Sequence, residues 1–264
     1  MYEFNYHKAG SVADAAAKVS GADDGVLMAG GMTLIPTMKQ RLAMPSDVVD
    51  LAGAGDLVGI SVANSVVSIG AMTTHAAVAA SAEVQNAIPA LAKLAGGIGD
   101  PAVRNRGTIG GSIANNDPAA DYPAAVVGLG ATVVTNQREI AGDDFFTGMF
   151  ETALEEGEII VRVDFPVPAK AAYSKFPNPA SRYAIVGVLV AKTGGGVRVA
   201  VTGAGACAFR AAAMEDALNG NFSPSALDGI SIDDSDLNSD IHASAEYRAH
   251  LVGVMAKRAV AACG

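Results

Sequence analysis

Two glycine pairs in apolar surroundings place the strongest constraint on what this chain can fold into. They lie in the segments Ala29-Gly30-Gly31-Met32-Thr33 and Thr108-Ile109-Gly110-Gly111-Ser112. A glycine pair lacks two Cβ atoms and permits positive φ, so consecutive backbone N–H groups can point into one concavity that binds anions. One such pair is more often an ordinary tight turn. Two together could hold both halves of a pyrophosphate, which predicts a dinucleotide-binding protein without a Rossmann fingerprint.

The composition narrows the class of protein further. Half of the 264 residues are hydrophobic, which provides for a sizeable core in one large domain or two modest ones. A formal net charge of −9 argues against binding to nucleic acid or to an anionic membrane surface. The N-terminus lacks the apolar core of a signal peptide, and no apolar run approaches the roughly 20 residues that span a bilayer. A soluble, cytoplasmic protein is expected.

The cysteines and histidines exclude several kinds of site. Only Cys207 and Cys263 are present, whereas an iron–sulfur cluster usually needs about four thiolates. The four histidines are scattered, without metal-ligand spacing. The sequence therefore predicts no metal site on this chain, which cannot hold an iron–sulfur cluster by itself.

The first glycine pair lies in a predicted strand–loop–helix–strand unit. Short apolar strands are expected at 26–29 and 48–51, with a helix over 34–42 between them and a helix N-capped by Ser11 before them. Such a unit resembles a small βαβ module, so its strands are expected to be parallel.

Alternating apolar residues from 57 to 70 around Asn64-Ser65 then predict a hairpin. Further predicted elements are helices over 81–94, broken at Pro89, and over 121–129, and strands over 131–135 and 158–167.

A change in composition over 169–179, with two prolines, predicts a domain boundary near residue 170. Beyond it, strands are expected on both sides of Gly194-Gly195-Gly196, and the acidic stretch 228–240 is expected to be a surface loop. Helices are predicted over 209–218 and 246–262. The predicted organisation is a domain of residues 1–170, with lobes of roughly 1–54 and 55–170, followed by a domain of residues 171–264.

A third glycine segment, Gly203-Ala204-Gly205-Ala206-Cys207-Ala208, matches the GxGxxA pattern of dinucleotide-binding folds. Too little chain follows it for the repeated βαβ units of a Rossmann fold. A tight turn is therefore the better interpretation of this segment.

Polar residues follow the second glycine pair directly. Asn115 and Asp121 could form hydrogen bonds with ribityl or ribose hydroxyls. The alternative is that Asp117 or Asp121 caps the helix that follows, and Asp121 could serve both purposes.

Three cations near these segments have open interpretations. Lys175 could stabilise negative charge on a reduced cofactor, or it could be a solvated lysine in a linker. Arg104 and Arg106 could assist phosphate binding, or they could lie in a surface or subunit contact.

Both glycine segments and their surroundings match one known family. The matching sequence runs nearly from end to end and includes Ala29 to Leu34, Met38 to Leu42, Arg104 to Ser112, Asp117 to Asp121, Tyr173 to Phe176, Ala184 to Val188, Val199 to Gly203 and Tyr247 to Leu251. On these motifs the chain resembles the FAD-binding medium subunit of molybdenum hydroxylases, the carbon monoxide dehydrogenase and xanthine dehydrogenase group. The order of the two glycine motifs is the most specific part of the resemblance.

The resemblance implies an α+β fold. A bilobal FAD-binding domain of the vanillyl-alcohol oxidase type would come first, with a small three-stranded lobe and a larger lobe containing an antiparallel sheet. A small C-terminal domain with a three-stranded antiparallel sheet and helices would follow. The flavin would lie between the two lobes, and Gly203 would fall at a strand end away from the pyrophosphate.

The resemblance also implies residue roles. Ala29, Gly30, Gly31, Met32 and Thr33 would hold the FAD pyrophosphate through backbone N–H groups and the Thr33 hydroxyl. The remaining implied contacts are Thr108, Gly110, Gly111 and Ser112 to the pyrophosphate, Asn115 and Asp121 to the ribityl and ribose part, and Ile98 and Lys175 to the isoalloxazine.

Position 32 departs from the pattern of the family, which often has His or Gln there. A methionine cannot form the hydrogen bond that either of those side chains can form. The departure leaves the backbone contact intact and bears on the tuning of the redox potential of the flavin.

The resemblance implies an electron-transfer subunit without catalytic residues of its own. A large subunit would carry the molybdenum cofactor and a small subunit would carry 2Fe–2S clusters, commonly in a dimer of heterotrimers. Electrons would pass from the clusters through FAD to an external acceptor. The alternatives are a stand-alone FAD oxidase or dehydrogenase of related fold, for which the residues after the boundary look too few, and a flavin-free assembly module.

Overall fold

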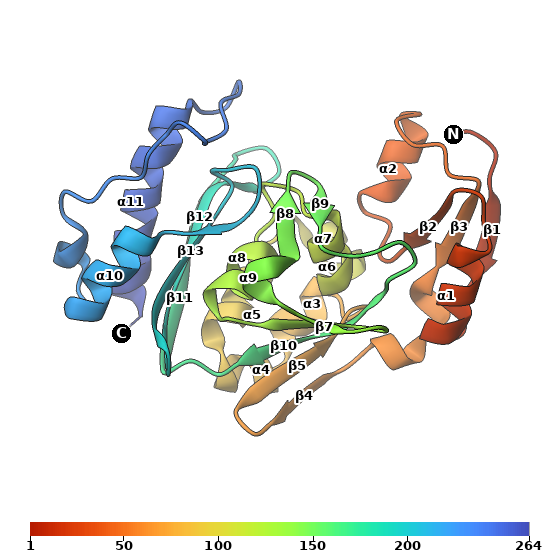
Figure 1. Ribbon diagram of the computed structural model, residues 1–264, viewed down its shortest axis with the longest axis horizontal. Helices are drawn as coiled ribbons and strands as arrows, with labels where there is room; N and C mark the ends of the chain where they lie inside the picture. The colour runs from red at the N-terminus through yellow and green to blue at the C-terminus, as the bar shows by residue number, and fades with distance from the viewer. Residues whose placement is uncertain (264) are drawn as a thin grey trace.

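The computed structural model describes residues 1–263 and contains three main sheets that follow one another along the molecule (Figure 1). The N-terminal lobe lies at one end, a larger central lobe follows, and the C-terminal sheet with its helices forms the other end. This order places two lobe junctions in the molecule, and the cavity described below lies along them.

The N-terminal lobe is the predicted βαβ module, with parallel strands. Its strands lie in the order β1 (Asn5–Lys8), β3 (Asp47–Asp50), β2 (Gly25–Met28), with α1 (Val12–Ser20), α2 (Leu34–Lys39), η1 (Leu51–Gly53) and η2 (Gly55–Leu57). Helix α2 is shorter than the predicted 34–42. It ends because Arg41 adopts a left-handed conformation with a φ of 62°, and the N–H of Leu42 then donates to the carbonyl of Thr37.

The central lobe contains an antiparallel sheet, as expected. Its strands lie in the order β4 (Ile60–Ala63), β5 (Val66–Gly70), β10 (Ile160–Pro166), β6 (Thr132–Thr135), β7 (Glu139–Ala141). The turn of the first hairpin holds Asn64 and Ser65 at φ values of 51° and 60°, the conformation that a two-residue hairpin turn requires.

Short helices cover this sheet. They are α3 (His75–Ala80), α4 (Ala82–Ala87), α5 (Pro89–Gly96), α6 (Pro101–Arg106), α7 (Ile109–Asn115), α8 (Tyr122–Gly128) and α9 (Gly142–Phe145), with the ribbon β8 (Phe146–Gly148) and β9 (Glu151–Thr152) beside them. The predicted break at Pro89 is confirmed, since α4 ends at Ala87 and α5 begins at the proline itself.

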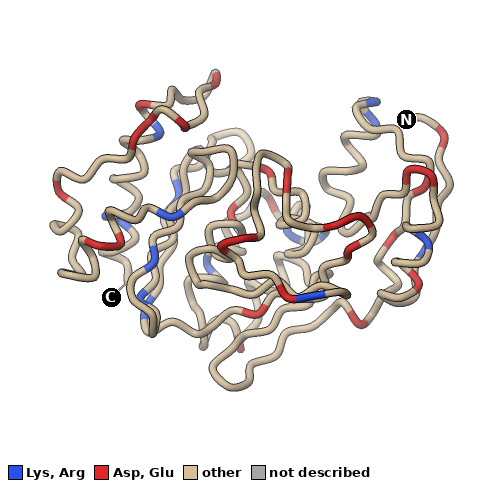
Figure 2. The backbone as a smooth tube through the Cα atoms, in the orientation of Figure 1, with Lys and Arg blue, Asp and Glu red and all other residues tan. Residues whose placement is uncertain are grey.

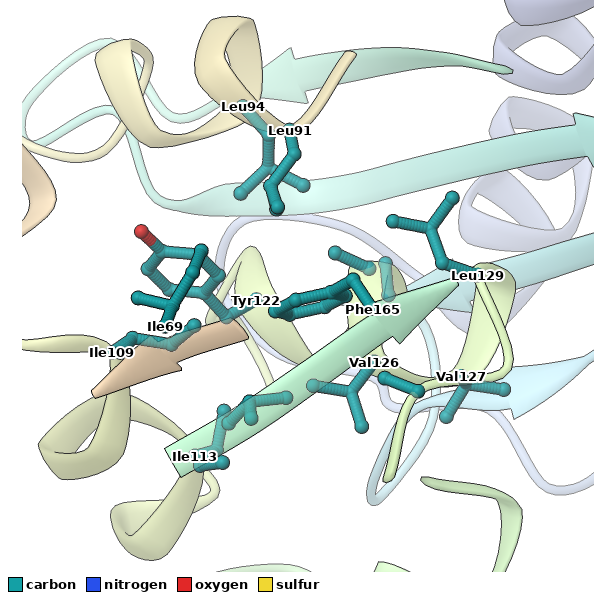
Figure 3. Close-up of a cluster of buried hydrophobic side chains, with 14 of the residues drawn as sticks. Ile69, Leu91, Leu94, Ile109, Ile113, Tyr122, Val126, Val127, Leu129 and Phe165 are labelled. Carbon is teal, nitrogen blue, oxygen red and sulfur yellow. The ribbon is translucent and has the colours of Figure 1, made fainter. Parts of the chain in front are cut away.

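The core of the central lobe joins the helices to the sheet. Figure 3 shows Ile109, Ile113 and Tyr122 converging from two helices on Phe165 of strand β10. All four are fully buried. Because the second glycine pair directly follows Ile109, packing of this core fixes the position of that segment.

The C-terminal sheet has four antiparallel strands, so the expectation of three is wrong. They lie in the order β11 (Lys170–Pro177), β12 (Ala184–Thr193), β13 (Gly196–Thr202), β14 (Phe209–Arg210), followed by α10 (Ala212–Gly220), η3 (Pro224–Leu227) and α11 (Ala245–Ala262). Phe209 and Arg210 were predicted to begin a helix, but they pair with Val201 and Ala200. The carboxylate of Glu215 accepts from the N–H of Val199 and from Arg210, which ties this short strand to the sheet.

The C-terminal sheet is bonded to the central lobe through one short segment. The carbonyl of Pro118 accepts from the N–H of Gly203, and that of Ala120 accepts from the Thr202 hydroxyl at 2.6 Å. The N–H of Ala184 donates to the carbonyl of Ala119. These bonds fix residues 118–120, which precede Asp121, against the ends of β12 and β13.

A buried carboxylate, Glu158, holds the loop before β10. Its side chain is fully shielded and accepts from Arg138 Nε at 3.0 Å, from the Thr135 hydroxyl at 2.7 Å and from the N–H of Glu155 at 2.8 Å. The hydrogen bond from Arg138 is the main reason that the pKa of Glu158 falls to about 2. The carboxylate form is therefore the one that the folded state prefers.

We predict that Glu158→Gln lowers the free energy of unfolding by about 1.5–3 kcal/mol at pH 7. Because the folded pKa lies below the ordinary value of 4.5, this stabilisation is fully present above pH 4.5 and is lost as the pH falls toward 2. Denaturant titrations at pH 7, 5, 4 and 3 should show the gap between variant and wild type closing. The exposed Glu156→Gln is the control, and a gap independent of pH would contradict the prediction.

His75 begins helix α3 and is only 4% exposed. Its ring packs against Tyr122 with centroids 5.3 Å apart, and its Nδ1 has no hydrogen-bond partner among residues 1–263. Burial, helped by the positive charge of Arg104, lowers the pKa of His75 from 6.5 to about 4. The folded protein therefore holds this histidine neutral at pH 5 to 6, where an unfolded chain would protonate it.

We predict that this residue alone costs the protein about 3 kcal/mol of stability as the pH falls from 6.5 to 4. The sign follows because the unfolded state binds the proton first in that window. When the free energy of unfolding of His75→Gln is measured as a function of pH, this loss of stability between pH 6.5 and 4 should be missing. The exposed His250→Gln is the control, and an unchanged slope in the His75 variant would count against the interpretation.

Candidate functional site

A cavity of about 930 Å³ lies where the two lobes and the C-terminal sheet meet. That volume is in the range of sites for small molecules and cofactors. All of the residues predicted for the site line it except Lys175: Ala29, Gly30, Gly31, Met32, Thr33, Ile98, Thr108, Gly110, Gly111, Ser112, Asn115 and Asp121. Segments from positions 29 to 121 of the chain are thus brought to one wall.

The first glycine segment forms a tight loop between β2 and α2. Gly31 has a φ of 72°, which is open to glycine and costly for other residues. A Cβ on Gly30 would overlap the carbonyl oxygen of Arg106, so this position can only be glycine at such close approach. The glycines therefore both shape the loop and let it touch the central lobe.

The backbone N–H groups of Gly30, Gly31, Met32 and Thr33 form no hydrogen bond within residues 1–263. All four residues line the cavity. A run of free N–H groups followed by the start of a helix presents partial positive charge to an anion. The first glycine pair therefore offers the free N–H groups that the predicted anion nest requires.

The second glycine pair is not a loop, and the prediction of a second nest of free N–H groups is wrong. Gly110 and Gly111 lie in the first turn of helix α7, which Thr108 caps. The N–H of Gly110 donates to the carbonyl of Ala71 at 2.8 Å, and that of Gly111 donates to the Thr108 hydroxyl at 3.1 Å. A Cβ on Gly110 would overlap Ala71, so the glycine is there for close packing.

Three of the predicted site residues on the cavity wall have polar side chains with no hydrogen-bond partner within the described chain. They are Thr33, Ser112 and Asn115. Asn115 is the last residue of α7, and the next residue, Asn116, ends the helix in a left-handed conformation with a φ of 42°. These side chains are available to a ligand, since they can form hydrogen bonds with it without breaking any hydrogen bond within the protein.

Asp121 is buried in a polar cluster supplied by strand β11. Its carboxylate accepts from the Tyr173 hydroxyl at 2.5 Å and pairs with Lys175 Nζ at 3.0 Å. Lys175 also donates to the carbonyl of Gly97 at 2.9 Å. Burial raises the pKa of Asp121, and the Lys175 charge and the Tyr173 hydrogen bond oppose that shift.

Neither acidic residue near the start of α8 caps it with its side chain. Asp121 occupies the N-cap position without a side-chain cap bond, and Asp117 accepts from the N–H of Ala119 in a turn of its own. The cation Lys175 stands behind Asp121 and does not line the cavity itself.

Arg104 is committed to the backbone near Ile98. Its guanidinium donates to the carbonyls of Ile98 and Gly99 at 3.1 and 3.0 Å. Arg104 thus fixes the segment that carries Ile98 to the cavity wall. No Lys or Arg side chain lines the cavity within residues 1–263, so the partial positive charge that its wall can offer an anion comes from backbone N–H groups.

Sequence reasoning missed several parts of the wall, among them Ala71, Met72 and His75 and two turns. One is the segment from Leu154 to Ile160, where Gly157 has a φ of 72°. The other is the turn between β11 and β12, which contributes Ser181 and Tyr183. A glycine after two glutamates could have signalled the first turn, whereas Tyr183 falls within a predicted strand and gives no signal of its own.

The segment at Gly203 lies outside the cavity wall. It follows the end of β13, where Gly203 has a φ of 83°, which confirms the interpretation as a turn. Figure 2 shows acidic residues in every part of the chain, with basic residues between them. Within residues 1–263 there is no cluster of His, Cys, Asp and Glu that could hold a metal ion, and no helix long and apolar enough to cross a membrane.

Two family models together match nearly the whole chain. Residues 2–168 match the FAD binding domain in molybdopterin dehydrogenase, and residues 171–263 match the CO dehydrogenase flavoprotein C-terminal domain. The nicotine 6-hydroxylase medium subunit of Paenarthrobacter nicotinovorans is 35% identical, over 98% of this chain and 96% of its own length. The carbon monoxide dehydrogenase medium chain of Afipia carboxidovorans is 35% identical over 97% of this chain and 95% of its own length.

Solved structures agree with these matches. The crystal structure of a Cu,Mo-CO dehydrogenase contains a chain with a TM-score of 0.91 and 35% identity, covering 100% of this chain and 98% of that one. Quinoline 2-oxidoreductase from Pseudomonas putida 86 gives a TM-score of 0.88 at 30% identity, covering 99% and 96%. The chain therefore belongs to the oxidoreductase family defined by the FAD binding domain in molybdopterin dehydrogenase, joined to a CO dehydrogenase flavoprotein C-terminal domain.

Proposed function

We propose that this chain is the FAD-carrying, electron-transferring medium subunit of a heteromeric molybdenum hydroxylase. The observation that carries the proposal is the run of free N–H groups from Gly30 to Thr33, in a cavity between two lobes of a chain that medium subunits match over nearly their full length. A large subunit with the molybdenum cofactor and a small subunit with 2Fe–2S clusters would complete the enzyme.

The residues present fit a dinucleotide such as FAD. Four unpartnered N–H groups suit a pyrophosphate, and the hydroxyls of Thr33 and Ser112 lie on the same wall. Within residues 1–263, no Lys or Arg lines this wall. Such a wall suits a ligand whose negative charge is spread over two phosphates, because backbone N–H dipoles can bind it. Apolar residues such as Ile98 and Leu27 provide surface for the ring systems.

The proposed roles follow the cavity wall. Residues Ala29 to Thr33 would hold the pyrophosphate, together with Thr108, Gly110, Gly111 and Ser112, the last group through hydroxyls and close approach. Asn115 and Asp121 would bind the ribityl and ribose hydroxyls. Ile98 would contact the isoalloxazine, and Lys175 would act from behind Asp121 as the cation that balances its charge.

Bound FAD would supply the redox chemistry, taking electrons from the iron–sulfur clusters of the small subunit and passing them to an external acceptor. The protein's own contribution would be to orient the cofactor and exclude water from its ring. Met32 is 37% exposed and has no hydrogen-bond donor in its side chain, so a hydrogen bond from this residue to the flavin would have to come from its backbone N–H.

We further propose the division into lobes 1–54 and 55–170 and a domain 171–264, with the bilobal part of the vanillyl-alcohol oxidase type. The three separate sheets and the boundary between the two family matches support it. A dimer of heterotrimers and a cytoplasmic location complete the proposal, and the free thiols of Cys207 and Cys263 are in line with a reducing compartment.

The test is to purify the chain with the subunits that accompany it and to record its visible spectrum. A flavin spectrum, FAD on release and mass analysis, and a co-purifying large subunit with a molybdenum cofactor are expected. No bound flavin and no uptake of added FAD would overturn the proposal. Oxidation of an organic substrate by the isolated, metal-free chain would instead favour a stand-alone oxidase.

Replacement of Gly30 by alanine should abolish FAD retention. The new Cβ would overlap the Arg106 carbonyl, so the loop must move away from the central lobe and take its N–H groups with it. We expect the flavin content per chain to fall at least about 10-fold, which corresponds to about 1.4 kcal/mol. Gly55→Ala, at a position with open space around it, is the control and should retain flavin.

Asn115→Ala should weaken FAD binding without destabilising the fold. The side chain has no bond to lose within the described chain, so the free energy of unfolding without FAD should change by less than about 0.5 kcal/mol. Loss of one hydrogen bond to the cofactor should raise the Kd for FAD about 3- to 10-fold. An unchanged Kd would remove Asn115 from the site.

A further inference from the structure

The turn between β11 and β12 closes one side of the cavity. Ser181 and Tyr183 of this turn line the cavity wall, although they lie far from the glycine segments in the sequence. The turn is held by the N–H of Asn178, which donates to the carbonyl of Tyr183 at 2.9 Å, and by the N–H of Arg182, which donates to the carbonyl of Asn178 at 2.9 Å. Tyr183 therefore owes its backbone position to Asn178.

Asn178 is 5% exposed, and its side chain also reaches Tyr183. Its Nδ2 donates to the Tyr183 hydroxyl at 2.9 Å, and it lies 3.4 Å from Nδ1 of His242. Its Oδ1 accepts from the N–H of Ala180 at 2.8 Å. One amide thus binds the turn, the phenol and a histidine from the segment before helix α11.

These bonds fix the direction of each hydrogen. Because Oδ1 is taken by an N–H donor, the amide must present its two hydrogens to Tyr183 and to His242. The phenol oxygen then accepts, and its own hydrogen has no acceptor within residues 1–263. The His242 ring packs edge to face on the Tyr183 ring, with centroids 5.9 Å apart, which also limits rotation of the phenol ring.

We propose that Asn178 is a positioning residue for the cofactor, acting through Tyr183. The amide holds the tyrosine against the cavity wall, so that the bound flavin cofactor meets a fixed aromatic side chain rather than a mobile one. This inference rests on the proposed function, namely that the cavity binds FAD. Asn178 itself does not line the cavity, so its effect must travel through Tyr183.

The test measures FAD binding to the protein with its accompanying subunits, after removal of the cofactor. Asn178→Ala should raise the Kd for FAD about 3- to 10-fold, the worth of one net hydrogen bond, and Tyr183→Phe should do the same. Both substitutions remove the same hydrogen bond, the one between the Asn178 amide and the Tyr183 hydroxyl. The double variant should therefore bind FAD no more weakly than Asn178→Ala. The circular dichroism of the bound flavin should change in all three.

Two further variants separate this role from a general effect on the turn. In Asn178→Asp, one carboxylate oxygen can accept from Ala180 and the other from the Tyr183 hydroxyl, so the Kd should return to within about twofold of the wild type. Asn219→Ala is the matched control, since the side chain of Asn219 also accepts from a backbone N–H of this sheet, that of Val197 at 2.8 Å, but forms no bond to a residue of the cavity wall. It should bind FAD as the wild type does.

A wild-type Kd in Asn178→Ala, or fold changes that multiply in the double variant, would overturn the inference. If Asn178→Ala does not fold, Tyr183→Phe decides, and a wild-type Kd in that variant overturns it. A wild-type protein that takes up no FAD would contradict the proposed function instead, so the two failures are distinguishable.

Discussion

The contact between the backbones at Gly30 and Arg106 is the one on which the cavity depends. Any side chain at position 30 would overlap the Arg106 carbonyl, so the N-terminal lobe reaches the central lobe only because a Cβ is missing there. Gly111 meets Ala29 across the same junction, and Gly107 lies against the His75 ring. Small residues on both sides of the junction between the two lobes thus allow the free N–H groups to lie at the cavity wall.

Two of the carboxylates that line the cavity are paired with cations of the same chain. Glu158 is paired with Arg138, and Asp121 is paired with Lys175, so neither carboxylate presents an isolated negative charge to an anionic ligand. The C-terminal sheet supplies Lys175 and also binds residues 118–120 through their carbonyls. The sheet is therefore part of the cavity wall, and its loss would unbalance the charge as well as open the cavity.

Local patterns predicted the elements that depend on local physics. The parallel module, the Asn64-Ser65 hairpin and the break at Pro89 all follow from hydrophobic period, turn chemistry and proline geometry. The second glycine pair and Phe209-Arg210 were assigned the wrong conformation. In both, contacts with distant residues decide: Ala71 and Thr73 accept the N–H groups of Gly110 and Ile109, and β13 pairs with Phe209 and Arg210.

The sequence by itself determined which residues form the cavity wall at the glycine pairs. The reason is that a glycine pair followed by a hydroxyl residue can be recognised from the sequence alone. Only the tertiary structure decided how each contributes. It separated a loop with free N–H groups from a helix start whose N–H groups are used, placed Lys175 behind Asp121, and added Tyr183 from beyond the predicted domain boundary. The reason is that hydrogen-bond partners and charge pairs are set by neighbours in space, and the charge pairs of Glu158 and Asp121 join residues 20 and 54 positions apart.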